Sequence, residues 1–180
     1  MRRVVVTGIG IVSCIGNNKE EVLKSLKDGK SGITHSSEHQ ELGFRSQVYG
    51  KPTLDPDEYL EKKERRFMGS GAAWNYIAMQ QAIEDSGLEN SEIVNENTGL
   101  IMGSGGPSTK ALIEAADITR EKGPKRVGPF AVPKAMSSTN SATLATPFGI
   151  KGVNYSISSA CATSSHCIGN AYETIQYGKQ

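Results

Sequence analysis

The sequence has no long apolar run and almost no net charge, and its first residues do not have the pattern of a signal peptide. No apolar stretch approaches the roughly 20 residues that a membrane-spanning helix needs, so we expect no transmembrane segment. The formal net charge is only +1, which gives no reason to expect binding to nucleic acid or to a membrane surface. Residues 1–8 are basic and then apolar, but glycines interrupt them too early for a signal peptide, so we expect a first strand there.

Cysteine and histidine are scarce, with three of each. Cys14, Cys161 and Cys167 form an odd set without any Cys-x-x-Cys pair. This pattern argues against a disulfide framework and favours a reducing cytoplasm. His35 and His39 lie in a polar stretch without a neighbouring cysteine, so we expect them in a solvated loop and expect no metal site.

The remaining composition is typical of a soluble globular protein, with 22% charged and 37% hydrophobic residues. A chain of 180 residues is long enough for one domain with a sizeable core, and it has no internal repeat or low-complexity segment. Strands that alternate with helices indicate an α/β layer fold. The hydrophobic pattern predicts strands at residues 4–9, 98–102 and 153–158, helices at 20–27, 68–86, 108–122, 133–144 and 162–177, and loops at 31–57 and 123–129.

Two glycine-rich turns resemble nucleotide-binding motifs but are incomplete. Residues 7–10 would begin a dinucleotide fingerprint, yet Ser13 stands where the third glycine is needed. Tyr59 and Lys63 have the spacing of a short-chain reductase pair but come too early in the chain to complete such a site. We therefore expect the first turn to allow close backbone packing. Residues 103–106, Gly-Ser-Gly-Gly, lack the Lys-Ser or Lys-Thr of a P-loop, so we expect this turn to make room for a ligand.

Cys161 is the strongest candidate for catalysis, because a β-branched run ends at this thiol and a helix follows. A helix N-terminus stabilises a thiolate, and the amide of Cys161 near a helix start can hold an oxyanion, which suggests covalent acyl transfer. Cys14 and Cys167 are expected to be buried apolar residues, Cys167 together with Ile168. His166 is no suitable base, since five helical residues turn its side chain by about 500° away from Cys161. The catalytic set within the chain is therefore incomplete.

Basic residues gather in two segments that are far apart in sequence. Composition alone favours two solvated loops over a docking patch for an acidic partner. The residues concerned are Lys62, Lys63, Arg65 and Arg66 in the first segment and Lys122, Lys125 and Arg126 in the second.

At residues 158–164, Ser-Ser-Ala-Cys-Ala-Thr-Ser, the chain resembles the β-ketoacyl-[acyl-carrier-protein] synthases. The resemblance extends in order over essentially all 180 residues, through residues 6–10, 66–68, 103–106 and 154–161. It points to the bacterial type I class of fatty-acid elongation, because type II members usually carry a bulky residue where Gly106 stands.

The resemblance implies a thiolase-like α/β fold, with residues 1–180 as an N-terminal domain whose five-stranded mixed sheet lies between helical layers. It also implies a cytoplasmic homodimer. Cys161 matches the nucleophile that takes an acyl group from acyl carrier protein as a thioester. Malonyl-carrier protein is then decarboxylated, and its carbanion attacks the thioester, which lengthens the fatty acid by two carbons. No cofactor is implied, because the substrates are carried on the phosphopantetheine of the carrier protein.

The resemblance also assigns binding residues, and it reverses the interpretation of the basic segments. Four of these residues match positions where the acidic carrier protein docks: Lys63, Arg66, Lys122 and Lys125. Three others match positions around the acyl-chain pocket: Gly106, Val132 and Met136.

The family's two catalytic histidines, its active-site lysine and its second oxyanion donor lie in a C-terminal half. The sequence is therefore expected to be an N-terminal piece that cannot condense on its own. One alternative is a thiolase or type III synthase acting on acyl-coenzyme A, although those families lack the Arg-Phe-Met context of residues 66–68. Another is that the isolated chain is a non-catalytic carrier-protein-binding module.

Overall fold

The computed structural model describes residues 2–180 and divides the chain into two compact units. Unit 1 holds Leu60–Tyr76, Leu88–Gln180 and the N-terminal residues up to Val6, and unit 2 holds Thr7–Tyr59 and Ile77–Gly87. Each unit is thus built from segments that are separated in sequence.

Unit 1 carries most of the regular structure and the candidate nucleophile. Its elements are α3 (Lys62–Arg65), the first part of α4 (Ser70–Ser86), α5 (Asn90–Ile93), β3 (Leu100–Ile101), α6 (Thr109–Lys122), the 3-10 turn η2 (Pro124–Arg126), α7 (Ala131–Ala135), α8 (Thr139–Leu144), β4 (Asn154–Tyr155), the 3-10 turn η3 (Ala160–Ala162) and α9 (Thr163–Gln176).

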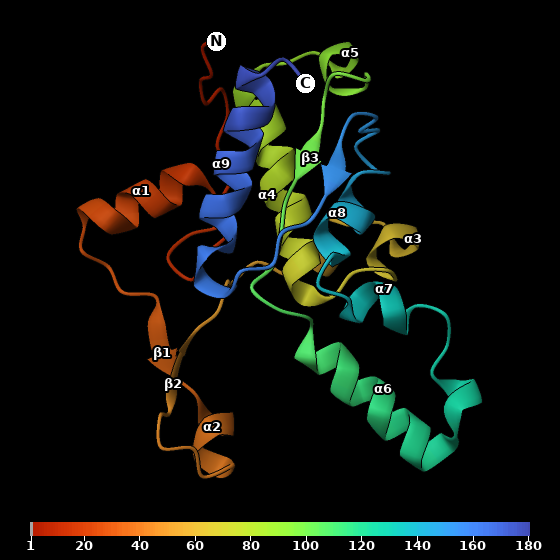
Figure 1. Ribbon diagram of the computed structural model, residues 1–180. Coiled ribbons are helices and arrows are strands. Elements are labelled where there is room, and N and C mark those ends of the chain that lie inside the picture. The colour runs from red at the N-terminus through yellow and green to blue at the C-terminus, as the bar shows by residue number, and fades with distance from the viewer. Residues whose placement is uncertain (1) are drawn as a thin grey trace. The chain divides into compact units, whose positions relative to one another are not determined.

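A short parallel sheet lies at the centre of unit 1. Leu100 pairs with Asn154 and Ile101 with Tyr155, and α9 contacts β3 while α8 contacts β4 (Figure 1). The amide of Leu100 also donates to the carbonyl of Val153. Leu100 of β3 is buried, whereas Asn154 and Tyr155 of β4 are exposed. The sheet leads the chain from β4 towards the start of α9.

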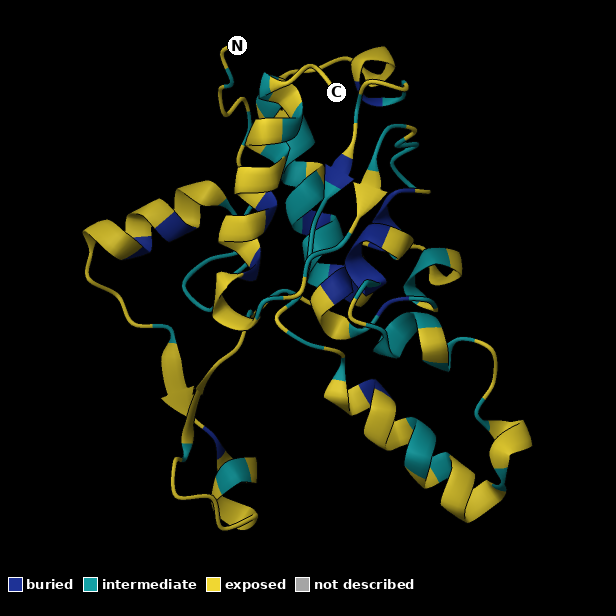
Figure 2. Cartoon of the chain, in the orientation of Figure 1, coloured by how far each residue is buried: buried dark blue, intermediate teal, exposed yellow. Residues whose placement is uncertain are grey.

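The core of unit 1 forms around this sheet. Met68 and Leu144 are almost fully buried, and Leu100, Ala111 and Cys167 join them. In contrast, most of α6 is exposed (Figure 2). The helix begins where Ser108 accepts a hydrogen bond from the amide of Ala111 and ends at Gly123, whose φ of +83° suits glycine.

Unit 2 combines one capped helix with a small antiparallel sheet. Its elements are α1 (Lys19–Lys27), β1 (Ile33–His35), α2 (Ser37–Glu41), β2 (Val48–Gly50), the 3-10 turn η1 (Pro56–Glu58) and the second part of α4. Asn18 caps α1 by accepting from the amide of Glu21, as expected of an asparagine at this position. The prediction of a loop over residues 31–57 is wrong, because β1, α2 and β2 lie within it.

The segment after Thr7 runs along α4 within unit 2. The amide of Ile9 donates to Asp85 at 2.9 Å, and the amide of Ile11 donates to Gln81 at 3.0 Å. A β-carbon at Gly8 or Gly10 would overlap backbone atoms of α4. Close backbone packing of this glycine turn is therefore confirmed. The predicted strand at residues 4–9 is wrong, because no strand is assigned there and the amide of Ile9 donates to a side chain of α4 instead of pairing with a strand.

Two further predictions about elements need correction. Residues 133–144 form two helices and not one, because Met136 takes an extended conformation with ψ of 147° between α7 and α8. Two two-stranded sheets are found over residues 2–180, so the five-stranded sheet is not confirmed. Within the same range, no helix has the length and apolar character needed to cross a membrane.

Candidate active site

Cys161 lies in η3, between β4 and α9, and is exposed. The strand-to-helix junction predicted for this thiol is therefore present. The residue before it, Ala160, has a φ of +44°, in the left-handed region that a residue with a β-carbon seldom adopts. Such backbone strain persists only where neighbouring groups hold it, and it is common at functional sites.

Thr163 is one of the groups that hold the bend. Its side chain is 4% exposed. Its Oγ1 accepts a hydrogen bond from the amide of Ser159 and donates one to the carbonyl of Ala160, both at 2.8 Å. These two bonds close the backbone on either side of the strained residue. Thr163 is the first residue of α9 and not its N-cap, so helix-capping signals in the sequence do not identify this role.

The Gly-Ser-Gly-Gly turn packs against the same loop. A β-carbon at Gly103 would overlap the carbonyl of Ile157 and approach Cγ2 of Thr163 to 2.7 Å. At Gly105 it would lie 3.0 Å from the carbonyl of Ala160, whereas nothing lies within 4 Å of a β-carbon at Gly106. Open space therefore lies only beside Gly106, whereas Gly103 and Gly105 allow close contact with the loop of Cys161.

A cavity of about 360 Å³ borders this turn, and Gly106, Lys134 and Asn140 are among the residues that line it. Asn140, on α8, is 2% exposed, and its Nδ2 donates to the carbonyl of Gly103 at 3.0 Å. Sequence analysis did not identify Asn140, because this contact joins residues 37 positions apart.

The three residues expected around the acyl pocket do not meet in one cavity. Gly106 lines the cavity beside the glycine turn, whereas Met136 lines another cavity of about 600 Å³. Val132, on α7, is 71% exposed. No single acyl-chain pocket is therefore formed by these residues of the chain.

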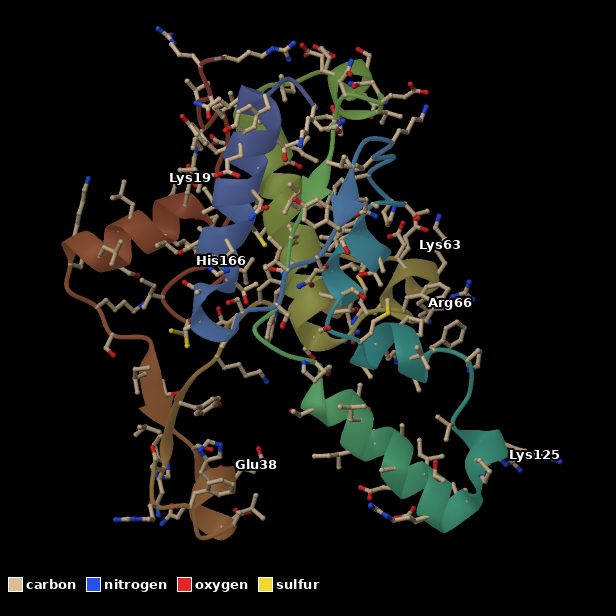
Figure 3. The ribbon with its side chains drawn as sticks, viewed as in Figure 1. Lys19, Glu38, Lys63, Arg66, Lys125 and His166 are labelled. Carbon is tan, nitrogen blue, oxygen red and sulfur yellow. The ribbon has the colours of Figure 1, made fainter. Side chains whose placement is uncertain are left out.

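Lys63 and Arg66 lie close together at α3 (Figure 3), and both line the cavity of about 600 Å³. The Arg66 guanidinium stacks over the rings of Phe67 and Phe130, with its central carbon 5.0 and 5.2 Å from the ring centres. Contact with ring faces holds a guanidinium in one orientation while leaving its charge available. The carboxylate of Glu61, 2.8 Å from Lys63, raises the pKa of that ammonium by hydrogen bonding to it.

Lys122 and Lys125 lie at the end of α6 and in η2, and both are exposed. Figure 3 places Lys125 at the end of α6 that is far from Lys63 and Arg66. The four predicted docking residues therefore form two exposed basic clusters within unit 1.

Within unit 1, His166 is not placed to serve Cys161. His166 is exposed on α9, and within residues 2–180 no hydrogen bond joins its ring to Cys161. The prediction of a solvated loop for the other two histidines is wrong, because His35 lies in β1 and His39 in α2, where its ring stacks on Phe44 at 5.1 Å. In the described part of the chain, no three metal-ligating side chains gather.

The other two cysteines differ in burial. Cys167 is 7% exposed, which confirms its prediction as a core residue, but the neighbouring Ile168 is 69% exposed and does not face the core. Cys14 is only partly buried. Cys167 is buried, Cys14 is partly buried and Cys161 is exposed, so Cys161 is the most accessible of the three cysteines.

Unit 2 contains a separate charged cavity of about 320 Å³, which Lys19, Glu84 and Asp85 help to line. Lys19 and Asp85 form an ion pair between α1 and α4. The hydrogen bond from Lys19, followed by that from the amide of Ile9, lowers the pKa of Asp85, and the same pairing raises the pKa of Lys19. Because neither partner is a nucleophile beside a base, we interpret this pair as structural.

Comparison with known proteins shows one consistent likeness. Residues 1–180 match the family described as "Beta-ketoacyl synthase, N-terminal domain". The chain is 55% identical over 181 residues to 3-oxoacyl-[acyl-carrier-protein] synthase 1 of Haemophilus influenzae, covering all of this chain and 45% of that protein. The chain thus spans less than half of the length of this curated relative.

Solved structures agree with this match. The crystal structure of a β-ketoacyl synthase from Burkholderia phymatum superposes with a TM-score of 0.84 at 28% identity, over 100% of this chain and 45% of that one. A type II PKS ketosynthase, solved in complex with its acyl-carrier protein and bound to the hexaketide, superposes with a TM-score of 0.73 at 18% identity. That alignment covers 99% of this chain and 48% of the ketosynthase, and it supports the fold alone.

Proposed function

Because the chain belongs to the β-ketoacyl synthase family and has its thiolase-like fold, we propose that Cys161 accepts an acyl group from acyl carrier protein. In the complete enzyme this thioester is elongated by two carbons in fatty-acid synthesis. The observation that carries the proposal is the exposed thiol at the start of α9, directly after a strained residue. A thiolate at a helix N-terminus is stabilised by the helix dipole.

The acylation step uses groups of this chain. The Cys161 sulfur attacks the thioester carbonyl of the acyl-pantetheine, a new carbon–sulfur bond forms and the bond to the pantetheine sulfur breaks. The proton of the Cys161 thiol ends on the released pantetheine thiol. The amide of Cys161, in the 3-10 turn before α9, is a donor suited to the oxyanion of the tetrahedral intermediate.

Condensation requires the remainder of the enzyme. Malonyl-carrier protein loses carbon dioxide, and the resulting carbanion attacks the acyl carbon, so that the Cys161 sulfur leaves as a thiolate. The family resemblance assigns the two histidines and the lysine of this step to the C-terminal half. We therefore expect residues 1–180 alone to take up an acyl group without forming a 3-oxoacyl product. The substrates bring their own phosphopantetheine, so we propose no resident cofactor or metal.

We propose two docking clusters for the acidic carrier protein, Lys63 with Arg66 and Lys122 with Lys125. Support comes from their exposure and from the aromatic stacking that orients Arg66. Complementary charges across such a surface raise the association rate more than they raise affinity.

Gly106, Val132 and Met136 are proposed to border the acyl chain in the assembled enzyme. The open space beside Gly106 supports this proposal, because a side chain there would occupy the adjoining cavity. Replacing Gly106 with methionine is then expected to shorten the longest acyl group that Cys161 accepts.

We further propose that the complete enzyme is a cytoplasmic homodimer whose N-terminal domain, residues 1–180, contains a five-stranded mixed sheet. The parallel pair of β3 and β4 is a suitable beginning for that sheet. A crystal structure of the complete polypeptide, its mass in solution and cell fractionation test these three points. A monomer with only the two short sheets would contradict the proposed assembly.

Incubation with an acyl-carrier-protein thioester tests the central proposal. We expect the intact mass to increase by one acyl group, and peptide mapping to place that group on Cys161. The increase should disappear in Cys161→Ala and persist in Cys167→Ala, because Cys167 is buried. A series of acyl lengths on wild type and Gly106→Met tests the acyl-site proposal in the same assay.

Two outcomes would contradict this function. An adduct that survives Cys161→Ala but disappears in Cys167→Ala assigns the chemistry to another thiol. A preference of the complete enzyme for acyl-coenzyme A over acyl carrier protein favours a thiolase or type III synthase instead.

A further inference from the structure

We propose that Asn140 is a positioning residue for the Cys161 loop and acts through the carbonyl of Gly103. The inference rests on the proposed role of Cys161 as the nucleophile. Asn140 does not touch Cys161, so its effect must pass through the glycine turn. Three observations in unit 1 support this path.

The first observation is the hydrogen bond itself. Nδ2 of Asn140 donates to the carbonyl of Gly103 at 3.0 Å, and the side chain is 98% buried. A hydrogen bond made at so buried a site is protected from competition with water. It fixes the turn relative to α8, a helix whose Leu144 is fully buried in the core.

The second observation is the contact between the turn and the loop. Gly103 lies against the carbonyl of Ile157 and the methyl group of Thr163, and Gly105 lies against the carbonyl of Ala160. Thr163 in turn makes the two hydrogen bonds that hold Ala160 in its left-handed conformation. A shift of Gly103 would therefore release the residue that directly precedes Cys161.

The third observation is that Asn140 carries an energetic penalty at this position. Its Oδ1 is buried and has no hydrogen-bond partner among residues 2–180. A buried acceptor without a partner destabilises the folded state, and a leucine of similar size would avoid that penalty. The bond donated to Gly103 is the property that leucine could not supply.

The neighbouring Thr139 provides a matched control. It is also buried on α8, and its Oγ1 likewise has no partner in the described part of the chain. It makes no side-chain bond to the turn. Thr139→Val therefore removes a buried polar group of similar shape while leaving the path from Asn140 to Cys161 intact.

Alkylation with limiting iodoacetamide, followed by peptide mass spectrometry, measures this effect without any carrier protein. We expect Asn140→Leu to slow alkylation of Cys161 by about two- to fivefold, the range that a helix-terminus interaction spans. Cys167 should stay protected, and Thr139→Val should leave all three thiols unchanged. If Asn140→Leu does not fold, Asn140→Ala replaces it, since the adjoining cavity has room for water.

Two results would overturn the inference. An unchanged rate at Cys161 in Asn140→Leu shows that the bond to Gly103 does not position the loop. Faster alkylation of Cys14 and Cys167 together with Cys161 shows that Asn140 only supports general stability. Because iodoacetamide requires no acyl substrate, failure of the acylation assay with a positive alkylation result rejects the proposed function and keeps the positioning role.

Discussion

At the scale of single residues, the glycine turn combines two different uses of a missing side chain. Gly103 has backbone and side-chain atoms where its β-carbon would be, whereas Gly106 has open space there. Sequence alone cannot separate these uses, because both residues are glycines in one short motif. The structure assigns the first to packing against the Cys161 loop and leaves the second free to border a substrate.

This difference predicts unequal effects of the same substitution on stability. Gly103→Ala should lower the free energy of unfolding by about 1–3 kcal/mol or more, as overpacking a tight contact does. Gly106→Ala should change it by less than about 0.5 kcal/mol, because the added methyl group meets nothing. Urea denaturation of the two variants measures both values. Equal destabilisation by the two substitutions would show that the turn is not packed as described.

The sequence was sufficient to predict Cys161 but not the residues that hold its loop. Cys161 is recognisable because the β-branched run, the thiol and the following helix are adjacent in the chain. Asn140 is not recognisable, since its importance depends on a carbonyl 37 residues away. The residues that the sequence does not predict are thus those whose roles depend on tertiary contacts.

At the scale of elements, local signals predicted the longer helices well. The helix expected at residues 108–122 is α6 (Thr109–Lys122), and the one expected at 162–177 is α9 (Thr163–Gln176). The Ser108 cap of α6 and the glycines after the two helices, Gly123 and Gly178, are local features. The predicted helix at residues 133–144 failed because its break at Met136 occurs without a glycine. The strand predicted at residues 4–9 is absent, and its last amide, that of Ile9, bonds a side chain of α4.

The ion pair between α1 and α4 predicts an acid-dependent loss of stability. Asp85 has a pKa below its usual value of 3.8, so its contribution is present above about pH 4 and disappears as pH falls through the lowered pKa. Asp85→Asn should therefore lower the urea midpoint at pH 7 but have little effect near pH 2. Urea denaturation at both pH values measures this difference.

The control is the exposed pair of Lys24 and Asp28 on α1. Asp28→Asn should leave the midpoint nearly unchanged at both pH values, because exposed ion pairs contribute little. A deficit of Asp85→Asn that is the same at pH 2 and pH 7 would show that the carboxylate charge is not responsible.

At the scale of the whole molecule, the family resemblance predicts more about the fold than the hydrophobic pattern does. The pattern predicts an α/β fold, but only the resemblance covers the entire chain and identifies its family. Non-local strand pairing limits prediction from local patterns, since each strand depends on partners distant in sequence. Here β3 and β4 are separated by α6, α7 and α8.

The two basic clusters predict a charge-dependent association with acyl carrier protein. Lys63→Glu combined with Lys125→Glu should lower the association rate by about tenfold at low salt, because steering by complementary charge is lost. The salt dependence of the association should weaken as well. Surface plasmon resonance at several salt concentrations measures both effects.

Lys151→Glu is the matched control, since Lys151 is an exposed lysine outside both clusters. It should change the rate only slightly. An equal loss in this control would mean that net charge, and not the location of the clusters, determines the association.

The hydrogen bond between the amide of Arg2 and the carbonyl of Gln176 has a consequence for biosynthesis. A ribosome adds roughly 5–20 residues per second, so the second residue waits roughly 10 to 35 seconds before its partner is made. Val5 and Val6, which follow Arg2 closely, are exposed during that interval and stay 67% and 80% exposed after folding. Unit 1 therefore cannot form this contact between its N-terminal residues and α9 until Gln176 has been synthesised.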